Sequence, residues 1–221
     1  MKRHSEEEID ALKERLLYMG SIVEEMIYLS VKSLMERKED ICQQVFSREE
    51  NVNKLQMEID ETSVRILALY QPEAVDLRTL MASVKINAEL ERIADQAVNI
   101  AQTTHYHLLR ESPIETMEIP QMAAIAQEMI KESLNAFAKR DVELAQSVLI
   151  KDEKLDVLKA KALNEIIRII PKHPEQTKQL VDLILIAKNF EKIGDHATNI
   201  VEDVIFMVVG KDIRHHSSSI Q

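Results

Sequence analysis

The stretch NFEKIGDHATNI, residues 189–200, carries two periodic patterns that together indicate the fold. Its apolar residues recur at steps of three and four, which is the spacing of one face of an α-helix: Phe190, Ile193, Ala197 and Ile200. Its carboxylates and its amide follow at steps of four, on a second face: Glu191, Asp195 and Asn199. We therefore predict a helix that buries the first face in a core and turns the acidic face largely away from it.

The same pattern occurs once more, 100 residues earlier. The segment LERIADQAVNI (90–100) aligns with FEKIGDHATNI (190–200), and the polar face recurs as Glu91, Asp95 and Asn99. A second block aligns at a shift of 103, residues 19–55 with residues 122–158. Two blocks in the same order indicate an internal duplication. The change of shift places a three-residue deletion in the second copy, between its two aligned blocks.

The composition favours an all-α protein. The 221 residues include only 3 glycines, 4% aromatics and no Trp, whereas residues of high helix propensity are abundant. Pro72 and the prolines of PKHPEQ (171–176) predict breaks between helices. The predicted helices cover about 6–36, 40–70 and 75–109 in the first half and 121–140, 141–170 and 177–209 in the second, with Gly210 ending the last.

Three helices in each half suit an up-down-up bundle with short connections. We therefore predict two tandem three-helix bundles, residues 1–110 and 121–210. A linker at 111–120, which contains two prolines, would join them, and residues 211–221 would form a flexible tail. The pattern leaves open whether the two bundles pack end to end or side by side.

The charge balance excludes some classes of partner. A net charge of −10 disfavours binding to nucleic acid and to anionic lipid surfaces, because both need a basic surface. Cys42 is the only cysteine, so no disulfide can form within the chain, and a reducing compartment fits. No apolar run approaches the roughly 20 residues that span a bilayer. We therefore expect a cytoplasmic protein without direct membrane insertion.

The paired acids suggest a metal site. Like charges one helical turn apart destabilise a helix unless something compensates them, and two such carboxylates can offer oxygens to Mg²⁺, iron or manganese. A solvated acidic face is the alternative. Further ligands would come from a neighbouring helix, and the candidates are Asp60 with Glu61, and Asp156 with Asp152. These candidates do not correspond between the copies, since Asp152 and Asp156 align with Glu49 and Asn53.

Other chemistry finds no support in the residue patterns. The sequence has no Glu-x-x-His, no His-Glu-x-x-His, no cysteine cluster, no glycine-rich phosphate loop and no Ser-His-Asp context, so we predict that the protein is not an enzyme. His196 aligns with Gln96 and is interpreted as a surface residue. Gly194 aligns with Ala94, and two small residues at one repeat position predict close approach by another helix.

The chain resembles the PhoU family, the accessory regulators of the bacterial phosphate-specific transport system. The resemblance rests on LERIADQAVNI and FEKIGDHATNI, on NVNKLQMEID (51–60) followed by QPEAVDLR (71–78), and on VIFMVVGKDIRH (204–215). It implies two three-helix bundles, a homodimer, and contacts with the ATPase subunit of the phosphate ABC transporter and with a phosphate-sensing histidine kinase. It implies bound metal ions, Fe, Zn or Mg. The implied ligands are Glu91, Asp95, Glu191 and Asp195, with Asn99 and Asn199 in or beside the sites.

Three functional hypotheses follow. The leading one is a regulatory adaptor that negatively controls the phosphate regulon. The second is a carboxylate-ligated metalloenzyme, and the third is a purely structural helical scaffold with solvated acidic faces.

Overall fold

The computed structural model describes residues 2–109 and 118–211, and within these ranges all regular structure is helical. The α-helices are α1 (Lys2–Glu36), α2 (Glu39–Tyr70), α3 (Ala74–Thr103), α4 (Glu118–Lys139), α5 (Val142–Ile169) and α6 (Thr177–Val209). The all-α prediction is confirmed. Within the described ranges, none of the helices has the length and apolarity that crossing a bilayer requires.

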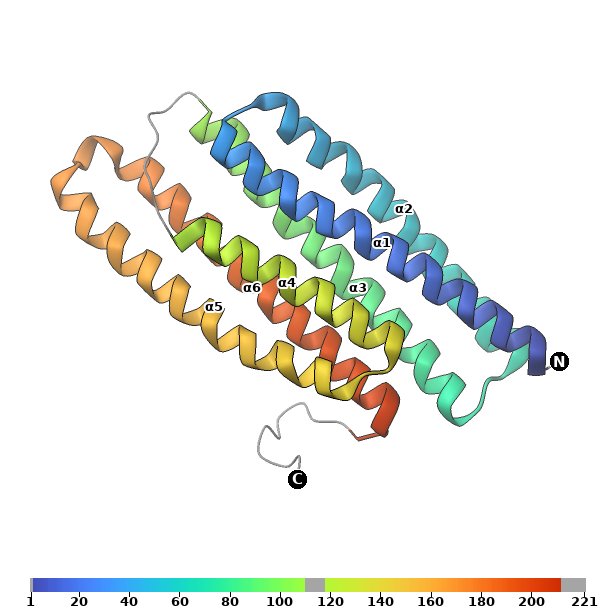
Figure 1. Cartoon of the computed structure of the whole chain (residues 1–221). Helices are drawn as coiled ribbons and strands as arrows, with labels where there is room; N and C mark the ends of the chain where they lie inside the picture. The colour runs from blue at the N-terminus through green and yellow to red at the C-terminus, as the bar shows by residue number, and fades with distance from the viewer. Residues whose placement is uncertain (1, 110–117, 212–221) are drawn as a thin grey trace.

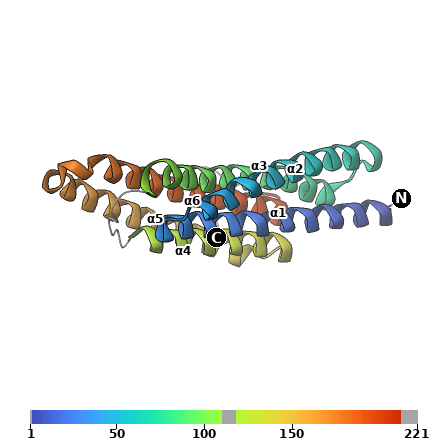
Figure 2. The same ribbon diagram turned by 90° about the horizontal axis from the view of Figure 1, so that it is seen from above.

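The two halves form three-helix bundles that lie side by side. Helices α1 to α3 pack on one another, as do α4 to α6, and the central seam is the antiparallel pair α3 and α6 (Figure 1). Helices α1 and α4 also touch, on the same side of that seam (Figure 2). The structure thus resolves the arrangement that the sequence pattern left open.

One hydrophobic core runs through both bundles. Phe190, Ile193 and their repeat counterparts Leu90 and Ile93 are all fully buried. The stripe predicted from the stretch 189–200 is therefore the core-facing side of α6. Because α3 presents the equivalent stripe, the two copies of the motif form the centre of the molecule.

The duplication is also visible in the turns. Arg37 and Arg140 correspond at a shift of 103, and both adopt the left-handed conformation, with φ of 53° and 55°. Each guanidinium donates a hydrogen bond away from its own turn. Arg37 donates to the carbonyl oxygen of Leu108, and Arg140 donates to the hydroxyl of Thr79 in the other bundle at 2.8 Å. The turns therefore help to fasten α3 to its neighbours.

Most predicted helix ends lie within a few residues of the observed ones. Gly210 ends α6 in the left-handed conformation, as predicted, with φ of 75°. Gln71 ends α2 in the same conformation directly before Pro72, which blocks continuation of the helix. The predicted break at 171–176 contains two 3₁₀ turns, Ile170–Lys172 and Pro174–Gln176.

Three predicted boundaries differ from the structure. Helix α1 begins at Lys2 rather than near residue 6. The end of the third helix is not α-helical, because Thr104–Leu108 forms a π-helical turn. Helix α4 begins at Glu118, inside the predicted linker, since a proline in the first helical turn removes no internal hydrogen bond. The rest of that linker up to residue 117 and the predicted tail from residue 212 lie outside the described residues.

Candidate functional site

The second bundle brings carboxylates from two helices together. Helix α5 supplies Asp152 and Asp156, and the adjacent α6 supplies Glu191 and Asp195. Gly194 allows this close approach. A Cβ atom at its position would lie 2.9 Å from Asp152 Oδ1 and 2.5 Å from Leu155 Cδ2, so the absent side chain lets α5 reach the backbone of α6, as the small residue predicted.

The electrostatics of this cluster are unfavourable for its negative charges. Burial, followed by the negative charges of Asp156, Asp195 and Glu191, raises the pKa of Asp152 to about 6. Partial burial and the nearby Glu191 raise the pKa of Asp195 as well. Lys159 compensates part of this charge, because its ammonium group pairs with Glu191. The cluster retains an excess of negative charge that a cation would relieve.

The first bundle has a smaller version of the same arrangement. Glu91 and Asp95 of α3 lie near Glu49 of α2. Burial raises the pKa of all three carboxyls, and the charge of Asp95 raises those of Glu49 and Glu91 further. The nearby His196 of α6 opposes the shift at Glu91 and Asp95.

Glu49 is the residue that the sequence reasoning missed. It aligns with Asp152 at the shift of 103, so the two copies place an acid at the same position of α2 and α5. The expectation that the extra acids do not correspond between the copies is therefore wrong for this pair. It holds for Asp156, whose counterpart is Asn53. The alignment of the two copies contained the signal for Glu49, because the two positions share a negative charge although the residue types differ.

The remaining predicted residues lie elsewhere. Asp60 is exposed on α2 and accepts a hydrogen bond from Asn87 Nδ2 at 2.9 Å, two helical turns or more from Glu49. Asn199 donates to Glu89 at 3.0 Å, and Asn99 lines a surface pocket between α3 and α6. The structure thus brings Glu91 together with Asp95, and Asp156 together with Glu191 and Asp195. Asp60 lies away from these groups, and the two asparagines face the seam between α3 and α6.

The carboxylates of each cluster lie near one another but do not converge on a single position. Among residues 2–109 and 118–211, no three His, Cys, Asp or Glu side chains are arranged to hold a metal ion together. The donor set is nevertheless one that hard cations accept, since it consists of carboxylate oxygens from two adjacent helices. A cation bound here would require these side chains to rotate inward.

A separate cluster joins the two bundles. Glu89 of α3 is buried and accepts hydrogen bonds from His196 Nδ1 at 2.7 Å and from Asn199 Nδ2 at 3.0 Å, both on α6. Arg92 pairs with its other oxygen at 3.2 Å. Burial alone would raise the pKa of Glu89, but the bonds from His196 and Asn199 outweigh it and hold the pKa below its ordinary value. His196, interpreted from the sequence as a surface residue, is thus a partly buried contact of the seam.

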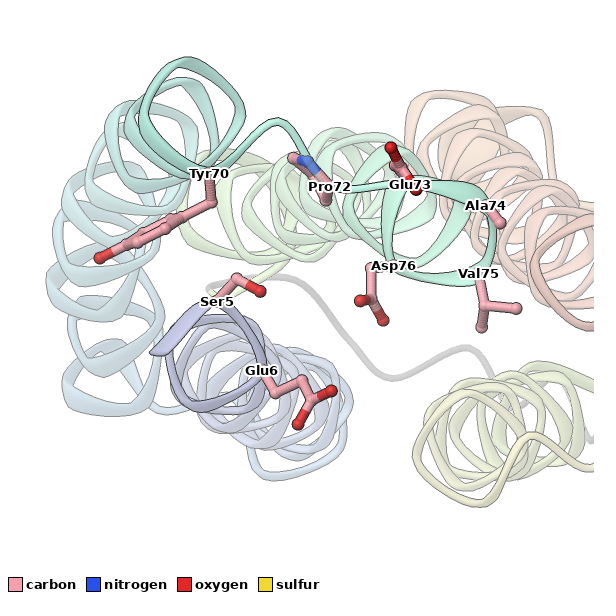
Figure 3. A pocket seen from close by; sticks show the side chains of 8 residues that line it. All are labelled: Ser5, Glu6, Tyr70, Pro72, Glu73, Ala74, Val75 and Asp76. Atoms are coloured by element: carbon pink, nitrogen blue, oxygen red, sulfur yellow. The ribbon is translucent and has the colours of Figure 1, made fainter. Parts of the chain in front are cut away.

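A further pocket is at the far end of the first bundle. It has a volume of about 630 Å³ and lies between the start of α1 and the turn that connects α2 to α3. Glu6 and Asp76 point toward the space between these segments, as Figure 3 shows. No hydrogen bond within the described part of the chain involves the side chain of either acid, so this pocket is an open acidic hollow and is remote from both carboxylate clusters.

The raised pKa of Asp152 predicts a pH dependence of stability. Its folded pKa of about 6 exceeds the unfolded value, so the folded chain binds the extra proton and its stability falls as the pH rises from about 4 to 6. In chelator at pH 7, Asp152→Asn should therefore raise the free energy of unfolding by about 1–2 kcal/mol, allowing for solvent screening. Below about pH 4, the variant and the wild type should be equally stable.

Denaturant unfolding at a series of pH values measures this difference. Glu153→Gln, a change of charge at an exposed neighbour, is the matched control and should show little pH-dependent difference from wild type. Equal stability of Asp152→Asn and wild type at pH 7 would show that the charge of Asp152 does not destabilise the folded protein.

Comparison with known proteins shows which protein family has this architecture. Residues 16–104 and 119–204 each match the PhoU domain family, which corresponds to one match in each bundle. The chain is 36% identical over 210 residues to a protein of Pseudomonas aeruginosa named phosphate-specific transport system accessory protein PhoU homolog, covering 94% of this chain and 86% of that one. It is 35% identical over 212 residues to PhoU homolog 2 of Thermotoga maritima, covering 96% and 90%.

Solved structures agree with the fold. The crystal structure of PhoU from Pseudomonas aeruginosa superposes with a TM-score of 0.89 at 35% identity, over 93% of this chain and 99% of that one. The phosphate transport system regulatory protein PhoU from Streptococcus pneumoniae superposes with a TM-score of 0.87 at 24% identity, over 94% and 98%, and this likeness bears on the fold alone.

Proposed function

This chain belongs to the PhoU family, and on that premise we propose that it is a cytoplasmic regulatory adaptor of phosphate uptake and phosphate-starvation signalling. In this role it has no chemistry of its own. It acts as a homodimer and contacts the ATPase subunit of a phosphate ABC transporter and a phosphate-sensing histidine kinase. Through these contacts it keeps the phosphate regulon repressed when phosphate is plentiful.

The observation that carries the proposal is the match, over 94% and 96% of this chain, to two named accessory proteins of phosphate transport. The shape of the molecule supports it. Long helices arranged side by side expose extended faces suited to partner proteins, and the overall charge of −10 favours partners with basic surfaces.

The regulatory role has a direct genetic test. Deleting the gene from its host should switch on phosphate-starvation genes in phosphate-rich medium, and the intact gene should restore repression. Unchanged expression of those genes in the deletion strain would contradict the proposal.

The carboxylate clusters have a place in this function. We propose that they bind Fe, Zn or Mg ions, with Glu91, Asp95, Glu191 and Asp195 as ligands and with Glu49, Asp152 and Asp156 contributing from α2 and α5. The raised pKa values of Asp95, Asp152 and Asp195 support this, because a bound cation would stabilise the ionised carboxylates that the protein otherwise disfavours. The ions would brace the helices or complete a docking surface.

Metal content provides the test. The purified wild type should contain bound metal by elemental analysis, and a variant with Glu91, Asp95, Glu191 and Asp195 all changed to Ala should lose it, because the carboxylate oxygens are the ligands. Glu50→Ala combined with Glu153→Ala is the matched control, since these are exposed acids adjacent to the clusters and occupy equivalent positions in the two copies of the repeat. Equal metal content in the wild type and the quadruple variant would refute these sites.

A further inference from the structure

A basic pocket lies on the seam between the two bundles, apart from the carboxylate clusters. It has a volume of about 380 Å³ and is lined by the last turns of α3, the π-helical turn and the first half of α6. Lys188 and Lys192 stand one helical turn apart on its α6 wall, and no lining residue is acidic. In a chain with a net charge of −10, such a concentration of positive charge is unexpected.

The positive charges of this pocket are not compensated within the described ranges. Neither Lys188 nor Lys192 forms an ion pair there, whereas Lys85, on the other side of the seam, pairs with Asp203 at 2.7 Å. His107 also lines the pocket, and its Nδ1 lies 3.0 Å from the buried carboxylate of Asp182, which fixes the orientation of the ring. Asn99 and Asn189 add amide groups from the two walls.

The duplication supplies an internal comparison for this pocket. Because α3 and α6 pack antiparallel and correspond at a shift of 100, each contact between them has an equivalent on the other side of the seam. The equivalent is found by adding 100 to the number of the α3 residue and subtracting 100 from that of the α6 residue. The pair Glu89 and Asn199, bonded at 3.0 Å, corresponds to Asn189 and Asn99. The pair Lys85 and Asp203 corresponds to Leu185 and Thr103. All four of these counterparts line the pocket.

The two sides of the seam differ in charge. One side is filled by its own ion pairs and holds the acids Glu89, Glu202 and Asp203. On the other side these acids are replaced by Asn189, Gln102 and Thr103, while Lys192 remains at the position of Arg92 and Lys188 is added at the position of Ala88. Three internal anions are absent from this side, while the number of lysine and arginine side chains is unchanged, because Lys188 offsets the replacement of Lys85 by Leu185. The pocket therefore has the charge and the donors for an anion from outside.

We propose that this pocket binds a small tetrahedral oxyanion, free or as the phosphoryl group of a small molecule. Lys188 and Lys192 bracket the anion, because residues one turn apart on a helix present their side chains to the same point. The amides of Asn99 and Asn189 donate hydrogen bonds to its oxygens. The inference rests on the pocket and its counterpart, and it does not depend on the proposed regulatory role.

Calorimetric titration of the full chain tests this site. The chelator-treated protein is titrated with inorganic phosphate and, separately, with adenosine monophosphate, at low ionic strength. Removing metal beforehand separates this site from any anion held through a cation in the carboxylate clusters. We expect saturable binding of at least one probe. Binding of phosphate would identify a free anion as sufficient, and binding of the monophosphate alone would identify a phosphoryl group on a larger molecule.

Variants assign the binding to the pocket. Lys188→Gln combined with Lys192→Gln should weaken binding at least tenfold, and Asn189→Glu, which restores the acid of the filled side, should weaken it as well. Lys54→Gln combined with Lys154→Gln removes the same charge from exposed positions of α2 and α5 and should leave binding unchanged. No binding of either probe by the wild type, or equal binding by the Lys188/Lys192 variant, would overturn the proposal.

Discussion

Replacing Phe190 with alanine is expected to lower the free energy of unfolding by about 3–5 kcal/mol. Phe190 is fully buried and is among the largest side chains of the core. It lies on the face of α6 that packs into the core shared by the two bundles. The loss has two sources, the apolar surface returned to water and the cavity left in a core that can collapse only in part. Chemical denaturation followed by far-UV circular dichroism measures it.

The matched control is Val181→Ala. Val181 is an exposed apolar residue on the same helix, so its truncation should change the free energy of unfolding by less than about 0.5 kcal/mol. If Phe190→Ala were as mild as Val181→Ala, the motif at 189–200 would not be the centre of the fold.

Replacing Glu89 with alanine is expected to cost about 2–3 kcal/mol of stability at pH 7. The carboxylate is buried in the seam, and its removal leaves His196 and Asn199 without their common acceptor. The effect should depend on pH. The folded pKa of Glu89 lies below the unfolded value, so its contribution is present above the unfolded value and is lost as the pH falls below about 4.

A double-mutant cycle isolates this contact. Glu89→Ala combined with His196→Ala should be less destabilising than the sum of the two single changes, with a coupling energy of about 0.5–3 kcal/mol. Glu50→Ala on α2 is the control, because Glu50 is exposed and lies on a different helix from both Glu89 and His196. Strict additivity of Glu89 and His196 would show that this contact does not hold the two bundles together.

The helices and the core could be predicted from the sequence because both depend on local patterns. The stripe around Phe190 and its copy around Leu90 fixed the buried faces of α6 and α3, and Pro72 and Gly210 fixed two helix ends. The π-helical turn after Thr103 could not be predicted, because no residue type requires it there. It depends on how the end of α3 packs.

The sites were less predictable because they lie between helices. The four-residue spacing alone predicted that Glu91 lies beside Asp95 and that Glu191 lies beside Asp195, since i,i+4 neighbours share a helix face. Finding Glu49 required the alignment of the copies to be read for charge as well as for identity. The contact of Glu89 with His196 joins residues 107 positions apart, and only the packing of α3 against α6 reveals it.

The same packing explains how one duplicated sequence produces three different polar environments. Within each bundle, adjacent helices bring acids together, most strongly around Asp152. Across the seam, one side pairs its charges internally through Glu89, and the other leaves Lys188 and Lys192 facing a pocket. Divergence of the two copies at a few polar positions thus separates a structural contact from the two binding sites that we propose, one for cations and one for anions.

The measurement that tests the regulatory role most directly is binding of the purified chain to the ATPase subunit of the host's phosphate ABC transporter and to its phosphate-sensing histidine kinase. Each partner is immobilised in turn and the chain is passed over it, with the ATPase subunit of an unrelated transporter as the control surface. We expect saturable binding to both phosphate-system partners and none to the control. Absence of binding to both would contradict it.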